Sequence, residues 1–142
     1  MLLVYVDDII LAGKDLSRIK EVKNYLHQQF KIKDLGELRY FLGLEIARSK
    51  AGIVMNQRKY CVELLTDTGF LEAKGCKSPM EVNLRLSNQQ GNRLEDPSVY
   101  RNLVGRLHYL TITRPDITFA VQQLSQFQND PYSQHLEAAH RV

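Results

Sequence analysis

Two short apolar runs open the chain, and only a pair of aspartates separates them. The runs cover residues 2–6 and 9–13, with Asp7 and Asp8 between them. Apolar runs of strand length that are joined by a short polar pair are typical of a β-hairpin. The pattern therefore predicts a hairpin with its turn at Asp7-Asp8, although this turn contains neither glycine nor asparagine.

A spacing of three and four residues replaces this pattern in the next stretch. The apolar positions that keep this spacing are Ile19, Val22, Leu26 and Phe30. They predict a helix over residues 17–30, with Asp15 or Ser17 available as its N-cap. The apolar stripe of such a helix needs a sheet to cover, and the first hairpin is the sheet nearest in sequence.

A period of two follows the helix. The alternating apolar residues are Leu38, Tyr40, Leu42, Leu44 and Ile46. They predict a strand, which residues 49–52 can turn back into the apolar residues 53–55. The sequence therefore predicts a second hairpin after the helix.

The second half of the chain has a mainly helical pattern. A helix from about Arg58 is expected to end at Gly69, because glycine suits the left-handed position that closes helices. Residues 71–95 show little periodicity and are predicted to be a connecting segment with at most one short strand.

Three further helices are predicted beyond that segment, each introduced by a polar residue followed by proline. These pairs are Asp96-Pro97, Arg114-Pro115 and Asp130-Pro131. Proline is well accommodated at the first position of a helix, whereas it ends a helix that precedes it. The last of these helices is expected to be still running at Val142.

Composition narrows the class of protein without naming a function. Hydrophobic residues make up 44% and charged residues 25% of the 142 residues, which is typical of soluble globular chains. No apolar run approaches the roughly 20 residues that cross a bilayer, and no targeting signal is visible, so no membrane partner is expected.

Cys61 and Cys76 lack partners at zinc-site spacing and favour reduced thiols inside a cell. The net charge of +3 is a weak footprint for a nucleic-acid binder.

Asp7 and Asp8 are the first candidates for chemistry. Neighbouring side chains of a strand point to opposite faces, so two adjacent aspartates can aim at one spot only where the chain turns sharply. Two like charges at such a place repel each other, and a divalent cation removes that penalty. Magnesium prefers carboxylate, phosphate and water oxygens, as in two-metal phosphoryl transfer. An exposed turn that is merely acidic is the alternative interpretation.

A series of motifs gives the aspartates a context. Tyr5-Val6-Asp7-Asp8 between apolar strands resembles the Tyr-x-Asp-Asp box of reverse transcriptases. Other blocks along essentially the whole chain are similar, in order and approximate spacing, to the polymerase of copia-type LTR retrotransposon polyproteins. These blocks are Asp34-Leu35-Gly36-Glu37, Tyr40-Phe41-Leu42-Gly43-Leu44-Glu45-Ile46, Gln57-Arg58-Lys59-Tyr60, Ser78-Pro79-Met80, Tyr100-Arg101-Asn102-Leu103-Val104-Gly105, Tyr109-Leu110-Thr111 and Thr113-Arg114-Pro115-Asp116-Ile117.

The resemblance implies roles for individual residues. Asp7 would be a principal metal ligand and catalytic residue, and Asp8 a supporting carboxylate. The residues implied to bind substrate are Tyr5, Val6, Phe41, Leu42 and Gly43. The first two would shape the floor under the primer end and the incoming nucleotide, and the other three would form a primer grip. A packed aromatic, an ordinary strand residue and a β-bulge at the glycine are the respective alternatives.

The resemblance also implies an α+β fold in three parts. Residues 1–56 would be the C-terminal part of a reverse transcriptase palm, with the first hairpin, its helix and a primer-grip-like second hairpin. Residues 57–95 would be a thumb-like helix with a connecting segment, and residues 96–142 a truncated helical connection segment.

The implied activity is RNA-directed DNA synthesis by two-metal nucleotidyl transfer. Its partners would be an RNA template, a DNA primer, deoxynucleotides and the remainder of the polyprotein, with Mg²⁺ or Mn²⁺ bound only in the complete polymerase. The family pattern needs a further aspartate on an earlier strand and fingers, which this sequence lacks, so we expect the isolated chain to be inactive. The alternatives are a noncatalytic transposon-derived remnant, a nucleic-acid-binding module, or an unrelated small α+β protein.

Basic residues and histidines give weaker signals. Arg58, Lys59, Arg101 and Arg106 could contact phosphates of a hybrid duplex or occupy exposed helix positions. The histidines at positions 27, 108, 135 and 140 lack ligand spacing with the cysteines, and we interpret them as core or surface residues.

Overall fold

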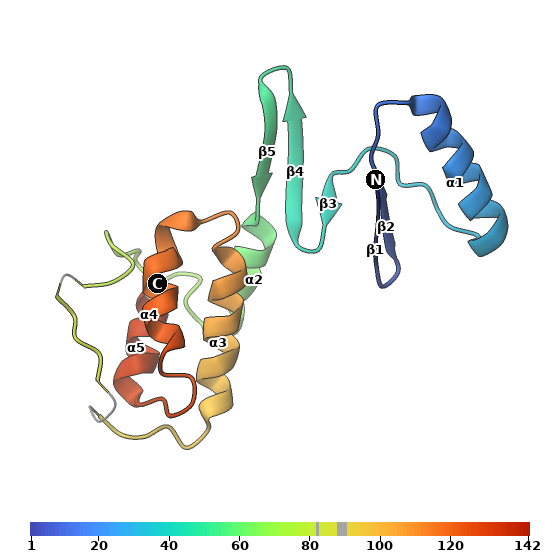
Figure 1. Cartoon of the computed structure of the whole chain (residues 1–142). Coiled ribbons are helices and arrows are strands. Elements are labelled where there is room, and N and C mark those ends of the chain that lie inside the picture. Colours follow the sequence, from blue (N-terminus) through green and yellow to red (C-terminus); the bar gives the residue numbers. More distant parts are fainter. Residues whose placement is uncertain (82, 88–90) are drawn as a thin grey trace. The chain divides into compact units, whose positions relative to one another are not determined.

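The computed structural model describes residues 1–81, 83–87 and 91–142 of the chain. The chain divides into two units, Met1–Asn56 and Gln57–Val142, which Figure 1 shows in blue to green and in green to red. The first unit holds small antiparallel sheets and one helix, and the second is helical. The fold is therefore mixed α+β, as the sequence predicts.

The first hairpin forms where the apolar runs predict it. Strands β1 (Leu2–Tyr5) and β2 (Asp8–Leu11) pair antiparallel, and Tyr5 lies opposite Asp8 in the last pair before the turn. The turn residues are therefore Val6 and Asp7, whereas the sequence predicted Asp7 and Asp8. That prediction was wrong by one residue, because apolar Val6 gave no sign that the first strand ends at Tyr5.

Helix α1 (Leu16–Phe30) begins at Asp15, whose carboxylate accepts hydrogen bonds from the amides of Ser17 and Arg18 at 2.9 and 3.2 Å. This arrangement satisfies amide groups that a helix start leaves without partners, and it confirms Asp15 as the N-cap. None of the residues of α1 is fully buried. A hollow of about 370 Å³ between the start of the helix and the open end of the hairpin is lined by residues that include Leu2, Leu11 and Ile19.

A second sheet completes the first unit. It contains β3 (Tyr40–Phe41), β4 (Leu44–Ser49) and β5 (Gly52–Asn56) in antiparallel order. The hairpin predicted at residues 49–52 is confirmed, because Ser49 pairs with Gly52. The single strand predicted through Leu38 and Ile46 is wrong: Leu42 and Gly43 form a two-residue turn that divides it. A turn of two residues preserves the alternation of side chains, so the period of two continues through it.

The second unit is built from helices whose ends follow the predicted signals. Helix α2 (Arg58–Thr68) ends at Gly69, whose φ is +77°. Helix α3 (Pro97–Leu110) begins at Asp96, whose side chain accepts the amide of Ser98 at 2.8 Å. The three-residue turn η1 (Pro115–Ile117) leads into α4 (Thr118–Ser125).

The last helix and the connecting segment differ in detail from expectation. Helix α5 (Ser133–Arg141) starts three residues after Asp130, with Tyr132 as its N-cap. In the described part of the connecting segment, which excludes residues 82 and 88–90, the strand pairing is limited to a single bridge between Arg93 and Tyr132. None of the helices in the described ranges is both long and apolar enough to span a bilayer.

The core of the second unit surrounds α3. Helices α3, α4 and α5 all contact one another. The fully or almost fully buried hydrophobic residues are Leu64, Tyr100, Leu103, Val104, Leu107, Leu110, Ile117, Ala120, Val121, Leu124, Ala138 and Ala139. The hydroxyl of buried Tyr100 donates a hydrogen bond to the Leu124 carbonyl at 2.7 Å, so the polar end of this side chain is satisfied. Burial also raises the pKa of Tyr100 above its ordinary value.

Replacing Leu124 by alanine should destabilise the helical unit by about 2–5 kcal/mol, because it opens a cavity at a side chain with no exposed surface. Urea unfolding followed by helical circular dichroism measures the change. The matched control is Leu71→Ala, at a leucine that is 51% exposed, and its effect should stay within about 0.5 kcal/mol. Equal effects of the two substitutions would contradict the assigned core.

Candidate functional site

The tip of the first hairpin has an unusual backbone. The φ of Val6 is +50°, whereas Asp7 is not among the residues with positive φ. A positive φ at the first of two turn residues is typical of a type II′ turn, whose twist fits the twist of the flanking strands. Glycine is the usual residue there, and a β-branched side chain in this conformation costs on the order of 1–3 kcal/mol. The hairpin therefore holds Val6 in a strained conformation directly beside Asp7.

Asp7 and Asp8 are both exposed at this tip. The first is in the turn and the second begins β2 opposite Tyr5. In the described ranges, neither carboxylate forms an ion pair with a basic side chain. Carboxylate oxygens are the donors that Mg²⁺ and Mn²⁺ prefer, so these two residues suit a hard divalent cation.

The two carboxylates do not form a complete metal site on their own. Among the residues that the structure describes, His, Cys, Asp and Glu side chains do not gather in groups of three or more that could hold a metal. Magnesium requires near-octahedral oxygen coordination. The two carboxylates of the tip are therefore too few to complete such a coordination sphere.

The neighbours of the aspartates are exposed as well. Tyr5 is 55% and Val6 is 81% exposed. Tyr5 is therefore not a packed aromatic within the described residues, and Val6 is a turn residue rather than a strand residue. Their exposure leaves both side chains accessible beside the carboxylates.

Phe41 is the last residue of β3, and Leu42 and Gly43 form the turn that follows it in the other sheet of the same unit. The φ values of Leu42 and Gly43 are +49° and +81°, and two positive values are typical of a type I′ hairpin turn. Gly43 is accordingly a turn residue and not a β-bulge. Phe41 is half-buried, and Leu42 is 36% exposed.

Comparison with known proteins identifies the family. Residues 1–82 match the family model described as reverse transcriptase (RNA-dependent DNA polymerase). The chain belongs to the reverse transcriptase family. Its curated relatives include copia-type Pol polyproteins: it is 44% identical over 141 residues to the retrovirus-related Pol polyprotein from transposon RE1 of Arabidopsis thaliana. It is 35% identical over 149 residues to the Pol polyprotein from transposon TNT 1-94 of Nicotiana tabacum.

The alignments cover nearly all of this chain but only a small part of each polyprotein. The alignments cover 99% and 97% of this reverse transcriptase chain, but 10% and 11% of the two polyproteins. An uncharacterized mitochondrial protein of Arabidopsis thaliana is 37% identical over 99% of the chain and 58% of its own length. The chain thus spans about a tenth of the polyproteins that it matches. No solved structure matches it.

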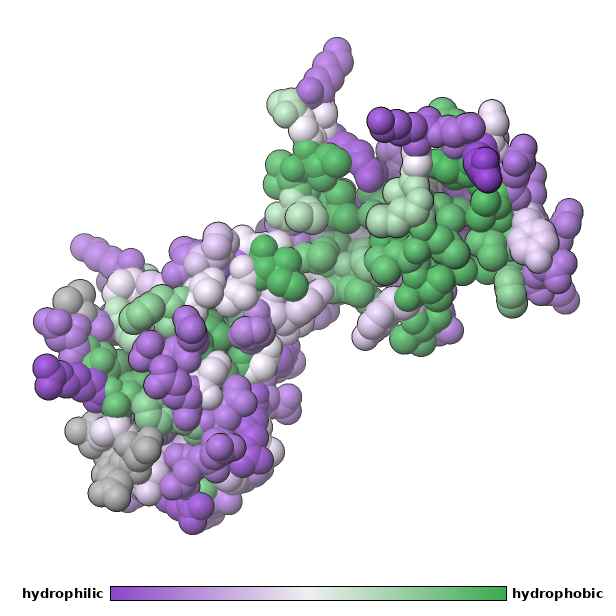
Figure 2. Space-filling view, in the orientation of Figure 1, coloured by the Kyte–Doolittle hydropathy of each residue, from purple (hydrophilic) through white to green (hydrophobic). Residues whose placement is uncertain are grey.

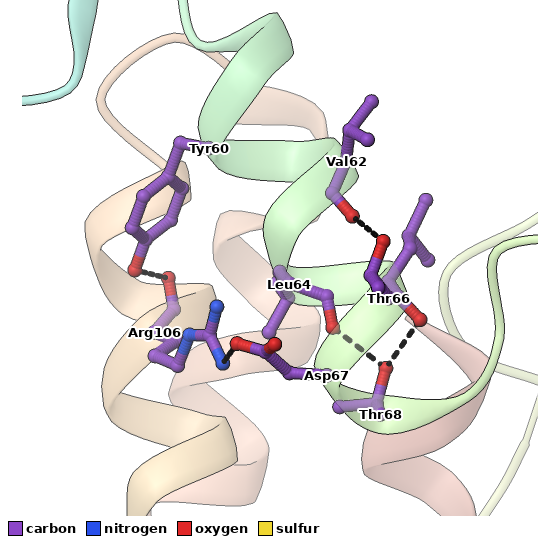
Figure 3. A network of polar contacts seen from close by, with 8 residues as sticks. Tyr60, Val62, Leu64, Thr66, Asp67, Thr68 and Arg106 are labelled. Carbon is purple, nitrogen blue, oxygen red and sulfur yellow. Dashed lines mark hydrogen bonds and ion pairs between the residues drawn. The ribbon is translucent and has the colours of Figure 1, made fainter.

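Two of the basic candidates, Arg106 and Arg101, contact other elements of the helical unit. The Nη1 atom of Arg106 lies 2.8 Å from the carboxylate of Asp67, and its guanidinium lies over the ring of Tyr60 at 5.9 Å. The Tyr60 hydroxyl donates to the Arg106 carbonyl, so these contacts join α2 to α3, as Figure 3 shows. Arg101 donates from Nε to the Gln128 carbonyl at 2.7 Å. Both arginines therefore connect elements of the helical unit.

The sequence motif at residues 34–37 has a structural role that the pattern alone did not reveal. Asp34 accepts hydrogen bonds from the Lys23 ammonium at 2.8 Å and from the Gly36 amide at 2.9 Å. The Lys23 contact is the main reason why the pKa of Asp34 is held below its ordinary value. An aspartate two residues before a glycine is a recognised turn signal, and it could have identified this turn, but the lysine partner is eleven residues away.

Replacing Val6 by glycine should stabilise the first hairpin by about 1 kcal/mol, because glycine adopts a positive φ without the steric strain of valine. Amide hydrogen exchange of the paired strand residues measures this change. The control is Val4→Gly, at a strand residue paired with Ile9, where glycine should weaken the hairpin. Destabilisation by both substitutions would contradict the strained turn.

Proposed function

We propose that Asp7 and Asp8 supply part of the divalent-metal site of an RNA-directed DNA polymerase encoded by a copia-type retrotransposon. The observation that carries this proposal is the hairpin tip, which exposes both carboxylates inside the segment matched by the reverse transcriptase family. The substrates would be an RNA template, a DNA primer and deoxynucleotides, and the family's description as an RNA-dependent DNA polymerase supports this proposal.

The hairpin supports different tasks for its residues. Asp7 acts as a principal metal ligand, and Asp8 acts as a supporting carboxylate at the start of β2. When bound, a pair of Mg²⁺ or Mn²⁺ ions supplies activation of the primer hydroxyl and neutralises charge on the departing phosphates. The antiparallel ladder of β1 and β2 fixes the tip, so the carboxylates do not need to be ordered separately when metal and substrates bind.

The exposed residues around the carboxylates are proposed to position substrates. Tyr5 and Val6 lie beside Asp7 and form the floor under the primer end and the incoming nucleotide. Phe41 at the end of β3 and the turn residues Leu42 and Gly43 act as the primer grip. A tight turn with both φ values positive presents backbone with little side chain around Gly43, which permits close approach of another molecule.

We propose that the remainder of the polyprotein supplies additional ligands that hold the metal ions in place. Two carboxylates leave most of the coordination sphere of each ion to water and phosphate. In-line attack requires both ions to be held closely in position. The chain alone is therefore proposed to be inactive, and the longer polyprotein active.

The isolated chain should bind Mg²⁺ or Mn²⁺ weakly, with dissociation constants on the order of millimolar or above, because two exposed carboxylates offer few ligands. A magnesium titration that follows the carboxyl resonances of Asp7 and Asp8 by NMR measures this affinity, and Asp7→Asn should weaken it further. Micromolar binding by the unmodified chain would contradict the ligand count.

The isolated chain should extend no primer on an RNA template, whereas a longer protein that includes the preceding polyprotein sequence should do so. In that longer protein, Asp7→Asn preserves the shape of the side chain and removes its charge. Synthesis should fall by at least about a hundredfold, since the substitution removes a metal ligand. The assay measures deoxynucleotide incorporation into a labelled primer.

The control in the longer protein is Glu21→Gln, which removes one exposed negative charge from α1 and should leave synthesis unchanged. Undiminished synthesis with Asp7→Asn would favour a merely acidic turn and overturn the catalytic assignment. Extension by the unmodified 142-residue chain would overturn the requirement for further polypeptide. Absence of synthesis from the longer protein would favour the noncatalytic transposon remnant.

A further inference from the structure

His135 is a buried polar residue that the polymerase chemistry does not use. Its side chain has 0% exposed surface and lies in the core of the helical unit. The ring of Phe127 is stacked on it at 4.0 Å with an interplanar angle of 21°, and Tyr132 meets it edge-on at 6.0 Å. Tyr100 of α3 lies at 6.3 Å. The imidazole is thus enclosed by aromatic rings.

Both ring nitrogens of His135 have hydrogen-bond partners on the backbone. The amide of Tyr132 donates to Nδ1 at 3.0 Å, and Nε2 lies 3.1 Å from the Ser87 carbonyl. An amide can only donate, and a carbonyl can only accept. The two contacts therefore require the neutral tautomer in which Nδ1 is unprotonated and Nε2 carries the hydrogen.

A second proton has no place in this arrangement. It would go to Nδ1 and face the Tyr132 amide, so two N–H groups would oppose each other in a buried site. Tyr132 is the N-cap of α5 and His135 is its third residue. The same contact that excludes the proton therefore also satisfies an amide at the start of that helix.

The charged and titratable groups around His135 do not offset the cost of placing a second proton on Nδ1. The titratable group of α3 that contacts the ring is Tyr100, and its hydroxyl donates to the Leu124 carbonyl. From the connection between α4 and α5, the groups are Tyr132 and Asp130. Asp130 is paired with Arg93 of the connecting segment at 2.6 Å, so its attraction for an imidazolium is largely compensated. Burial is the main cause that lowers the pKa of His135, against the opposing effects of the Ser87 carbonyl and Asp130.

We propose that His135 is an acid-sensitive clasp, whose neutral ring joins the start of α5 to the connecting segment at Ser87 and whose protonation expels the ring and opens this junction. The device belongs to the helical unit and does not depend on the proposed role of Asp7 and Asp8. The proton binds at the Nδ1 atom, and the first turn of α5 is released when it does.

The direction of the pH dependence follows from proton binding. An unfolded histidine has a pKa of about 6.5, whereas the pKa of folded His135 is lower. In the closed form the neutral ring keeps its two hydrogen bonds, and in the open form it has left them. Between these two pKa values the open form binds more protons than the closed form, so the closed form loses stability as the pH falls below about 6.5. Above that pH the hydrogen bonds of neutral His135 contribute fully to the stability of the closed form.

The test uses the full chain at a series of pH values from about 7.5 to about 5, across the range in which histidine titrates. At the highest pH of the series, nitrogen NMR of the His135 ring should show the neutral tautomer with hydrogen on Nε2. Protection of the Tyr132 amide against hydrogen exchange, corrected for intrinsic rates, should fall by about tenfold per pH unit below about 6.5, since one proton is linked to opening.

Two variants separate the clasp from general acid sensitivity. Glutamine at this helix position can accept the Tyr132 amide but does not titrate, so His135→Gln should abolish the pH dependence of Tyr132 protection. His140→Gln should retain it, although burial also lowers the pKa of His140. If His135→Gln does not fold, the titration of the His135 ring in the unmodified chain, followed by nitrogen NMR, still tests the proposal. Titration near the ordinary pKa with unchanged Tyr132 protection would overturn the proposal, as would equal pH dependence with and without His135.

Discussion

Burial of the inner face of α3 is the interaction on which the helical unit depends. Tyr100, Val104 and Leu107 have almost no exposed surface, and α4 and α5 pack against the same helix. Each fully buried side chain of this size contributes roughly 1.5–3 kcal/mol. The polar contacts are arranged around this core. The hydroxyl of Tyr100 and the ring of His135 are both buried and hydrogen-bonded, so neither polar group is left without a partner in the core.

The first unit is held together in a different way. Within the described residues, the buried hydrophobic core belongs entirely to residues 57–142, and the first unit relies on backbone ladders and on local contacts such as the Asp15 cap and the Lys23–Asp34 pair. Figure 2 shows hydrophobic surface over much of this unit, whereas the visible face of the helical unit is mainly hydrophilic. The proposed metal-binding tip and the buried core therefore lie in different units of the chain.

The sequence predicted most elements because their signals are local. Asp15, Asp96 and Gly69 act at helix ends through neighbouring residues, and each is found in that role. The Leu42-Gly43 turn could not be recognised from periodicity, since two turn residues leave the alternation unchanged. The partners of Arg101, Arg106 and His135 are 27, 39 and 48 residues distant, and such pairings depend on tertiary packing that a single sequence does not display.

The two-stranded sheet of β1 and β2 has a further consequence for handling the protein. Each strand has an outer edge without a strand partner in the described residues, and Leu2, Leu3 and Val4 are each at least 45% exposed. Exposed apolar edges can pair with strands of other molecules, and natural proteins usually cover or charge them. Concentrated solutions of the isolated chain are therefore expected to aggregate through this hairpin even while the helical unit remains folded.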